Sequence, residues 1–398
     1  MDRKIYDLCV IGGAGHVGLP FSVAFAAAGK KVAIYDINPD TTNLISHGIA
    51  PYMEKGLDSI LNNVLSTGNL ILTLDPKVVS QSNTIVITIG TPVDEFLNPV
   101  FSDIFICFEQ LLPYLSDEQL VILRSTLFPG TTDRLAKWLQ SKGKSPLLAF
   151  CPERVVEGKA IEEILNLPQI ISGTSLDAEE KAKLFFQTIK VEVVPLTPIE
   201  AEFAKLFTNA YRYISFAISN QFFMIANSAG QDYDKILKGI KYHYHRMDAL
   251  SSAGFTAGPC LFKDTMQLNS FAKNEFGLGQ AAMNINEGLV LYLIDRLKTR
   301  YNLADTSFGL LGMAFKAGSD DIRSSLSYKL KKGLVFLAKQ VFTTDPYVTI
   351  DKSLVSIEET IDKSDVLILC VPHPEYKMLK CTKPIVDIWG FLGNGTLI

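Results

Sequence analysis

The first half of this 398-residue chain alternates short apolar runs with helical patterns, and this alternation limits the folds open to it. The runs are apolar almost throughout, so both faces of each strand are expected to be buried. Continuous apolar strands separated by helices are typical of a parallel sheet covered by helices on both sides. The sequence therefore predicts an α/β, doubly wound fold. The expected strands lie at 6–12, 31–36, 84–90, 119–126, 146–153 and 191–196.

A second α/β pattern returns after residue 305, and the stretch before it is helical. One helical pattern of about 32 residues follows Thr197 and Pro198, with Glu200 completing a capping box and Gly230 as its stop; at ~1.5 Å per residue it spans nearly 50 Å. A helix of this length is expected to join two domains and to offer an apolar face for dimerisation. The alternative is a long helix without a role in dimerisation.

We therefore predict two Rossmann-like doubly wound domains joined by a central helical domain with one long helix. The C-terminal α/β domain is the smaller of the two. The predicted boundaries are 1–196 for a dinucleotide-binding domain, 197–300 for the central domain and 301–398 for a second nucleotide-binding domain.

Charge and cysteine usage narrow the class of protein. The formal net charge of −4 argues against nucleic acid or an anionic membrane as a partner, and no apolar run has the length of a membrane span. The first residues lead directly into a strand, so no secretory signal segment is predicted. Six scattered cysteines without a Cys-x-x-Cys pair are typical of reduced thiols, and His243 and His245 lack a neighbouring cysteine or acid cluster. We expect a cytoplasmic protein without a metal site.

The glycines after the first predicted strand have the spacing of a dinucleotide site. Gly13, Gly15 and Gly18 form a Gly-x-Gly-x-x-Gly triplet between a strand and a helix, where the backbone and the helix N-terminus hold a pyrophosphate. Gly12 precedes the triplet, so the spacing alone leaves open which glycine makes the tightest turn. Asp36 ends the second strand, where a carboxylate binds ribose hydroxyls and repels a 2′-phosphate. The predicted cofactor is NAD.

Polar side chains also follow several later strands. Thr91 and Thr126 come after the third and fourth expected strands, and ligands in parallel sheets bind beyond the carboxyl ends of the strands. Each hydroxyl either contacts cofactor or substrate or caps a local turn. Four charged side chains follow other strands: Glu153, Glu157, Lys316 and Arg323.

The segment GPCLFKD places a cysteine in a turn of small residues, directly before two charged residues. A helix that begins there would bring Cys260 and Asp264 onto one face, because residues four apart lie together. On the long helix, Lys205 and Asn209 have the same spacing. A lone cysteine is usually structural, but these surroundings fit a nucleophile.

With these motifs in order, the chain resembles the UDP-glucose/GDP-mannose dehydrogenase family, NAD-dependent enzymes that oxidise a nucleotide sugar to its uronate. The resemblance covers essentially the whole chain and rests on GHVGLP, STLFPGTT, CPERVVEG, AKLFTNA, the Cys-x-x-Lys-Asp segment and AFKAGSDDIRSS. It implies a four-electron oxidation at C6 of a UDP-linked sugar by a homodimer or larger homo-oligomer. Cys260 would capture the aldehyde as a thiohemiacetal, and a thioester would follow.

The resemblance also implies a role for each remaining candidate. Lys205 would stabilise the oxyanion with Asn209 beside it, and Asp264 would position or deprotonate groups near the thiol. Glu153 would serve acid–base chemistry or orient the hydrolytic water, with Thr126 holding a water. The binding contacts implied in the same way are Glu157, Lys263 and Arg323 on the cofactor side, Lys316 on the nucleotide-sugar side, and Arg246 toward a neighbouring subunit's substrate.

The turn before the nucleophile departs from the family's pattern. Many UDP-glucose dehydrogenases read GFGGSCFPKD, and this chain reads GFTAGPCLFKD. Thr256, Ala257 and Pro259 stand where glycine or serine is usual, and Phe262 replaces the proline. We expect this lead-in to bear on sugar preference.

Other motifs point to two different sugars. CPERV looks like the branch that acts on UDP-N-acetylhexosamines, as does the spacing from Arg246 to Cys260. The Lys263–Asp264 pair and Glu157 look like the UDP-glucose branch. On balance the first two features favour a UDP-N-acetylhexosamine.

Two other functions are compatible with parts of the chain. A two-electron dehydrogenase of hydroxy acids shares a Rossmann domain and a long helical domain, but it leaves Cys260 and the C-terminal domain without a role. A nucleotide-sugar-binding protein without turnover shares the fold. It would have no need of the charged residues that surround the expected nucleophile.

Overall fold

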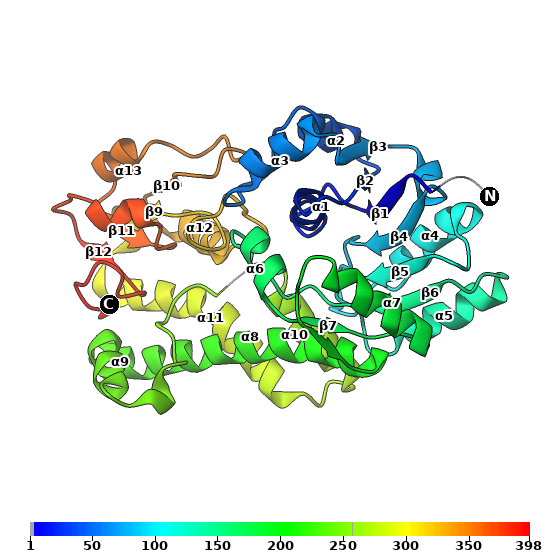
Figure 1. Ribbon diagram of the computed structural model, residues 1–398. Coiled ribbons are helices and arrows are strands. Elements are labelled where there is room, and N and C mark those ends of the chain that lie inside the picture. The colour runs from blue at the N-terminus through cyan, green and yellow to red at the C-terminus, as the bar shows by residue number, and fades with distance from the viewer. Residues whose placement is uncertain (1–3, 257) are drawn as a thin grey trace. The chain divides into compact units, whose positions relative to one another are not determined.

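The computed structural model describes residues 4–256 and 258–398, which form two compact units that meet in the sequence between Thr208 and Asn209. The first unit is built on a six-stranded sheet in the order β3-β2-β1-β4-β5-β6, with every neighbouring pair parallel (Figure 1). This is the Rossmann order, which reverses direction between β1 and β4. The strands are β1 (Tyr6–Ile11), β2 (Val32–Tyr35), β3 (Leu70–Thr73), β4 (Ser82–Ile87), β5 (Leu120–Leu123) and β6 (Leu147–Phe150).

Strand β1 shows why the apolar runs form a sheet with two covered faces. Leu8 and Val10 belong to one hydrophobic cluster, and Cys9 and Ile11 belong to the other. Successive side chains of a strand point to opposite faces, so an uninterrupted apolar run fills both cores and confirms the predicted doubly wound fold. The helices of this unit are α1 (Gly18–Ala27), α2 (Pro39–Ser46), α3 (Leu57–Ser66), α4 (Ser102–Leu111), α5 (Thr131–Ser141), α6 (Ala160–Asn166) and α7 (Leu176–Gln187).

Two strands of the first unit differ from the predictions. Strand β3 is absent from the expected strands although Leu70, Ile71 and Leu72 form a short apolar run; it lies at the edge of the sheet, and only Leu70 of its four residues is buried. The expected strand at 191–196 does form, as β8 (Val193–Pro195). However, it pairs with β7 (Gln169–Ile171) in a separate two-stranded sheet and is not part of the Rossmann sheet. An apolar run predicts a strand but does not say which sheet it joins.

Helix α8 (Pro198–Ser228) confirms the predicted long helix and runs through the boundary between the two units. Its capping box forms as expected: Glu200 Oε2 accepts hydrogen bonds from the backbone nitrogen and the hydroxyl of Thr197, at 2.8 and 2.7 Å. Gly230, just after the helix, has a φ of 69°. This left-handed conformation favours glycine and ends the helix.

The second unit joins the remaining helices to a parallel four-stranded sheet in the order β10-β9-β11-β12. Phe223 of α8, Leu289 and Leu293 of α11, and Phe308 and Leu310 of β9 share one hydrophobic core. The division into three domains predicted from the sequence stays a prediction. The elements are α9 (Tyr233–Lys241), α10 (Leu261–Phe271), α11 (Gly277–Arg300), β9 (Ser307–Leu311), α12 (Leu326–Leu337), β10 (Gln340–Thr344), α13 (Ile357–Lys363), β11 (Val366–Leu369) and β12 (Ile385–Val386), with short 3₁₀ turns between some of them.

A buried carboxylate fastens the start of α8 to the Rossmann sheet. Glu202 accepts hydrogen bonds from the backbone nitrogen of Gly130 at 2.5 Å and from the backbone nitrogen and hydroxyl of Thr132 at 2.8 and 2.6 Å. Gly130 and Thr132 lie at the N-terminus of α5, whose unpaired amides need an acceptor. Lys205 lies about one turn after Glu202, so these three hydrogen bonds also fix the position of that lysine within the first unit.

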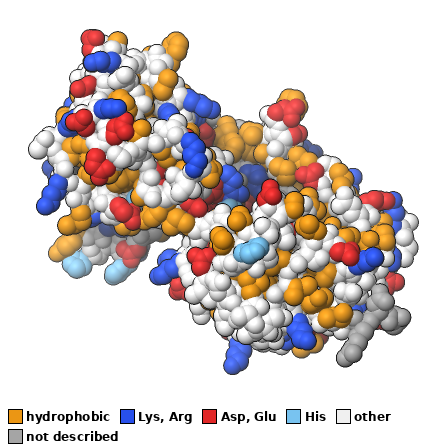
Figure 2. All heavy atoms as spheres, turned by 90° about the horizontal axis from the view of Figure 1, so that it is seen from above, with side chains coloured by type: hydrophobic (Ala, Val, Ile, Leu, Met, Phe, Trp, Pro, Cys, Tyr) orange, Lys and Arg blue, Asp and Glu red, His pale blue; other side chains and the backbone are white. Residues whose placement is uncertain are grey.

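The surface is mixed in character. On the face shown in Figure 2, acidic, basic and apolar side chains are interspersed over each unit. Within residues 4–256 and 258–398, no helix is both long enough and apolar enough to cross a membrane.

Candidate active site

The glycine loop between β1 and α1 is built for close approach of backbone. Gly12 has a φ of 72°, so this glycine, which precedes the predicted triplet, makes the left-handed turn. A Cβ atom on Gly18 would lie 2.5 Å from the Cα of Gly13 and 2.7 Å from the hydroxyl oxygen of Thr88. Gly15, by contrast, is exposed and has room above it. Gly13 and Gly18 therefore let the helix start against the loop, as a pyrophosphate site requires.

Two side chains tie this loop to neighbouring strands. The Thr88 hydroxyl, just after β4, donates to the carbonyl oxygens of Ile11 and Gly12 at 2.8 and 3.1 Å. Asp36, at the end of β2, accepts a hydrogen bond from the backbone nitrogen of Ala14 at 3.0 Å. The predicted ribose-binding carboxylate therefore lies against the glycine loop, and the cradle fits a dinucleotide. Thr88 belongs to no recognisable motif, because a lone threonine in a strand run is not distinctive.

A third support comes from the segment after α2. The ring of Tyr52 stacks on that of His16 with centroids 3.9 Å apart, and the Tyr52 hydroxyl donates to the carbonyl oxygen of Gly15 at 3.1 Å. His16 Nδ1 lies 3.9 Å from a carboxylate oxygen of Glu157. Glu157, expected on the cofactor side, therefore stands beside the glycine loop.

The loops after β4 and β5 carry the two predicted threonines. Thr91 and Thr126 are both partly exposed there. The hydroxyl of Ser125 donates to the carbonyl oxygen of Ile89 at 2.5 Å and joins the two loops. Both threonines thus lie beyond the carboxyl ends of strands, where a ligand of this sheet would bind.

Glu153, after β6, is a buried carboxylate with several donors. Its Oε2 is paired with the guanidinium of Arg124, and its Oε1 accepts from the backbone nitrogens of Arg154 and Val155 at 2.8 and 3.0 Å. Burial raises the pKa of Glu153, but the charge and hydrogen bond of Arg124, the amide of Val155 and the charge of Lys205 together lower it below the usual range. The structure thus favours the ionised form of Glu153.

In the second unit, Cys260 lies at the N-cap position of α10 and is exposed. The helix predicted to begin here does form, so Asp264 stands one turn after Cys260 on the same face. Asp264 is fully buried and accepts a hydrogen bond from the side-chain amide of Asn209 at 2.6 Å. Lys263 Nζ lies 3.6 Å from the other carboxylate oxygen of Asp264. The positive end of the helix dipole at Cys260 favours a thiolate there.

Four other cysteines have surroundings that suppress thiolate formation. Burial raises the pKa of Cys107 and Cys151 to about 12. It also raises the pKa of Cys9 and Cys370, which lie in or directly after apolar strands. Because the thiolate is the nucleophilic form, exposure and helix position single out Cys260 among these five.

The unusual lead-in to Cys260 packs against the rest of the second unit. Gly258 has a φ of 108°, and a Cβ there would lie 2.7 Å from the ring of Phe315. Phe262, which replaces the family's proline, lies edge-on to Tyr213 of α8 with ring centroids 6.3 Å apart. Ala257 lies outside the described residues. The turn therefore depends on Phe315, the neighbour of Lys316 in the loop after β9.

That loop is held by a buried pair which sequence analysis missed. Asp345, at the end of β10, accepts from the backbone nitrogens of Met313 and Ala314 at 2.6 and 2.9 Å and lies 3.1 Å from Nε2 of His373. His373 Nδ1 in turn accepts from the backbone nitrogen of Gly318 at 3.2 Å. Burial raises the pKa of Asp345, but His373 and the backbone amides lower it to about 2. The signal for Asp345 in the sequence is an Asp-Pro pair directly after a predicted strand.

Three predicted binding residues lie on the outside of the second unit. Lys316 is partly exposed, with Nζ 5.5 Å from the centroid of the Phe315 ring. Arg323 is exposed and bonds Asp321, with Nε at 2.8 Å and 3.0 Å from the two carboxylate oxygens. Arg246 is exposed on a short 3₁₀ turn, a placement compatible with contact to another molecule.

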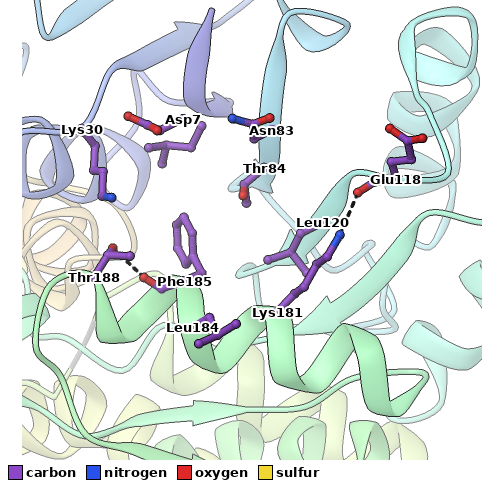
Figure 3. A pocket seen from close by; sticks show the side chains of 11 residues that line it. Asp7, Lys30, Asn83, Thr84, Glu118, Leu120, Lys181, Leu184, Phe185 and Thr188 are labelled. Atoms are coloured by element: carbon purple, nitrogen blue, oxygen red, sulfur yellow. Dashed lines mark hydrogen bonds between the residues drawn. The ribbon is translucent and has the colours of Figure 1, made fainter. Parts of the chain in front are cut away.

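A cavity of about 360 Å³ in the first unit has a different location (Figure 3). Asp7, Asn83 and Thr84 line it near the starts of β1 and β4, together with Lys181 and Phe185 of α7. The glycine loop, Asp36 and Glu153 all follow the carboxyl ends of strands, whereas this cavity lies at the amino ends. It is not the cofactor site.

The Rossmann order, the glycine cradle and the carboxylate after β2 define an NAD-dependent dehydrogenase. The chain belongs to the UDP-glucose/GDP-mannose dehydrogenase family. Its NAD binding domain matches residues 6–190, its central domain residues 199–288, and its UDP binding domain residues 309–394.

Two relatives show how far the similarity extends. A UDP-N-acetyl-D-mannosamine dehydrogenase from Pyrococcus horikoshii is 30% identical over 376 residues, which cover 92% of this chain and 89% of that protein. The solved structure of the UDP-D-ManNAc dehydrogenase from that organism has a TM-score of 0.88 at 29% identity, covering 96% of this chain and 94% of the other. The solved structure of the Staphylococcus aureus UDP-N-acetyl-mannosamine dehydrogenase Cap5O has a TM-score of 0.86 at 26% identity, with the same coverage of both chains. The chain is therefore an oxidoreductase of this nucleotide-sugar dehydrogenase family.

The glycine loop makes a direct prediction about cofactor affinity. Gly18→Ala places a carbon against Gly13 and Thr88, so we expect the loop to shift and NAD to bind at least about ten-fold more weakly, equivalent to roughly 1.4 kcal/mol. Calorimetric titration with NAD measures the change. Gly239→Ala, at a helix position with open space, is the control and should bind NAD normally. A folded Gly18→Ala variant with unchanged affinity would contradict this assignment.

Proposed function

We propose that this protein oxidises C6 of a UDP-N-acetylhexosamine, with N-acetylmannosamine as the sugar, to the uronate in two NAD-dependent steps. The observation that carries the proposal is the exposed Cys260 at the N-terminus of α10, one turn before the buried Asp264 that Asn209 holds. The choice of sugar is supported by the names of the two relatives, by the CPERV segment and by the spacing from Arg246 to Cys260.

Each oxidation removes a hydride from C6. NAD, when bound at the glycine loop, accepts that hydride in both steps. The first step also releases the hydroxyl proton and yields the aldehyde. The Cys260 thiolate then attacks the aldehyde carbon, a C–S bond forms, and the oxygen takes up a proton to give the thiohemiacetal. Loss of the second hydride and of that proton from the thiohemiacetal leaves a thioester on Cys260.

Lys205 and Asn209 are proposed to stabilise the negative oxygen in these steps. They lie four residues apart on α8 and therefore on one face. A side-chain amide nitrogen carries two hydrogens, so the bond from Asn209 to Asp264 uses one of them. The lysine charge and the amide dipole are held before the reaction, as electrostatic stabilisation of an oxyanion requires. Asp264 would keep Asn209 in place and position groups near the thiol.

Hydrolysis of the thioester completes the reaction. A water oxygen bonds to the carbonyl carbon, the C–S bond breaks, and the sulfur leaves as the thiolate while the uronate and two protons are released. The ionised Glu153 is suited to accept a hydrogen bond from that water and to orient it, and Thr126 is proposed to hold a water in the same network. Each uronate thus requires one water and the reduction of two NAD.

The remaining predicted residues are proposed as binding contacts. On the cofactor side these are Gly13, Gly15, Gly18, Asp36, Thr91, Glu157, Lys263 and Arg323. Lys316 is proposed to bind the nucleotide sugar, and Arg246 to reach the substrate of a neighbouring subunit. The predicted cytoplasmic location stays a prediction.

We also propose that helix α8 forms a homodimer interface. Tyr211, Ile218 and Ile225 recur every seven residues and are all exposed, and Phe222 extends the same face. A repeat of this spacing is typical of a seam between two helices. An exposed apolar stripe on a stable protein is usually covered by a partner.

The proposed reaction makes a quantitative prediction about NADH. A panel of UDP-, GDP- and N-acetylated sugars is assayed by NADH absorbance, and each product is identified by mass. We expect UDP-N-acetylmannosamine to give the highest kcat/KM and two NADH per uronate. One NADH per sugar would identify a two-electron dehydrogenase. Tight binding of a UDP-sugar without any NADH at high enzyme concentration would identify a binding protein.

Cys260→Ser tests the covalent step. We expect kcat for uronate formation to fall by a factor on the order of 10³ or more, because the hydroxyl is a poor nucleophile without a base, while the affinity for the nucleotide sugar is largely kept. Steady-state kinetics and calorimetric titration measure the two quantities. Cys381→Ser, at a partly buried cysteine, should retain full turnover. Normal turnover by Cys260→Ser would overturn the mechanism.

The α8 stripe makes a prediction about assembly. Ile218→Glu places a charge in the seam, so we expect the molar mass measured by light scattering to fall from that of a dimer toward that of a monomer. Phe336→Glu replaces an exposed phenylalanine of α12 and should leave the mass unchanged. A dimer that persists in Ile218→Glu would place the interface elsewhere.

A further inference from the structure

Arg124 is the largest fully buried side chain of the described residues, and no motif had drawn attention to it. It follows β5, and 1% of its surface is exposed. An arginine cannot lose its charge in a protein, so a positive charge stands permanently inside the first unit. Burying such a group costs several kcal/mol unless a partner offsets it.

The contacts of Arg124 fix its guanidinium in three directions. One terminal nitrogen pairs with Oε2 of Glu153, and the other donates to the side-chain oxygen of Gln169 at 3.1 Å. The guanidinium carbon lies 4.5 Å from the ring centroid of Phe21 and 5.5 Å from that of Phe186. Phe21 belongs to α1, which begins at the glycine loop, and Phe186 belongs to α7. Residues from α1, α7, β7 and the loop after β6 therefore hold this guanidinium in place.

Glu153 is fixed just as closely from its side. Its backbone nitrogen donates to the carbonyl oxygen of Arg124 at 3.2 Å, so the two residues are joined through both backbone and side chains. The backbone nitrogens of Arg154 and Val155 bind its other carboxylate oxygen. Only 6% of Glu153 is exposed, so it has little water to stabilise its charge.

We propose that Arg124 is a positioning residue that keeps Glu153 ionised and correctly oriented for the hydrolytic water. This inference rests on the proposed role of Glu153 in thioester hydrolysis. A purely structural ion pair is the competing explanation, since an apolar pair often stabilises a core equally well. The two explanations differ in what happens to the protonation of Glu153 when the guanidinium is removed.

The charged groups around Glu153 define that difference. Arg124 faces it from the loop after β5, Lys205 contributes from α8, and Arg154 is its neighbour in the chain. Without Arg124, burial acts against the carboxylate with weaker compensation, and its pKa is expected to rise, because the charge and the hydrogen bond that stabilise the ionised form are lost. A protonated Glu153 donates a hydrogen to the oxygen it faces and so presents the wrong partner to a water that must be oriented for attack.

The test uses Arg124→Met, Arg124→Lys and Arg134→Met in the full-length protein. Methionine keeps the packing between the two phenylalanine rings and removes the charge, while lysine restores it. Arg134 is an exposed arginine of α5 whose guanidinium carbon lies 5.8 Å from the ring centroid of Phe105, so Arg134→Met is the matched control. The rate of thioester hydrolysis is measured against pH in single turnovers, with the covalent adduct on Cys260 followed by mass spectrometry.

We expect the acid limb of the pH–rate profile, the low-pH range in which hydrolysis slows, to move up by about 1 to 3 pH units in Arg124→Met, with the adduct accumulating below the shifted limb. The first NADH should still form at a normal rate. Arg124→Lys should return the limb to within about one unit of the wild type, and Arg134→Met should not move it. If Arg124 has a purely structural role, Arg124→Met lowers the fraction of active enzyme and leaves the acid limb at its wild-type pH. That result would overturn the proposal.

A second measurement does not depend on turnover. If the pKa of Glu153 in Arg124→Met rises above its unfolded value of about 4.3, the folded state keeps a proton that the unfolded state releases. The unfolding temperature of this variant, relative to that of the wild type, should then fall as the pH rises from about 4.3 through the raised pKa. Adding Glu153→Gln should abolish that slope. A difference in unfolding temperature between Arg124→Met and the wild type that does not change with pH contradicts the inference.

These readouts separate the inference from the proposed function. No NADH from any sugar in the wild type would reject the proposed function, while the pH dependence of unfolding would still decide whether Arg124 keeps Glu153 ionised. Normal wild-type turnover with an unmoved acid limb in Arg124→Met would reject the inference alone. If Arg124→Met does not fold, the pH–rate profile and the unfolding profile are read in Arg124→Gln, which removes the charge but keeps hydrogen-bond donors. An acid limb unchanged from the wild type in that variant rejects the positioning role.

Discussion

A parallel sheet buried on both faces has room for polar groups only where its strands end, and this constraint organises the whole chain. Buried strands cannot accommodate a charge without a partner, so reactive side chains gather in the loops beyond the carboxyl ends. Both sheets follow this rule. The residues so placed are the glycine loop, Asp36, Thr88, Arg124 and Glu153 in the first unit, and Lys316, Asp345 and His373 in the second.

Short-range bonds then decide how those groups point. Thr88 and Asp36 bind the backbone of the glycine loop, which leaves Gly15 exposed beside the start of α1. Arg124 and Glu153 form a pair that each would be too costly to bury alone. Burial thus has a double effect: it makes each interaction strong, and it makes loss of one partner expensive. Groups prepared in this way do not have to reorganise when a substrate arrives.

Burial also separates Cys260 from the buried cysteines of both units. Buried thiols are kept protonated by their surroundings, and Cys260 differs because it is exposed at the first turn of a helix. One turn later, Asp264 is buried and bonded by Asn209 from α8. The helix α10 therefore joins a solvent-exposed thiol to a buried polar pair. Phe315 lies against Gly258 of the turn, and Phe262 packs edge-on to Tyr213.

The sequence by itself determined the features that depend on local order. Apolar runs, a glycine triplet and a capping box specify strands, a turn and a helix start, and all three formed where expected, as did the helix that places Asp264 on the face of Cys260. Only the tertiary structure decided which sheet the run at 191–196 joins and which distant groups meet. Arg124 and Glu153 are separated by 28 intervening residues, and Asp345 and His373 by 27. A pairing of this kind leaves no periodic trace in a sequence, because it is set by where strands end in space.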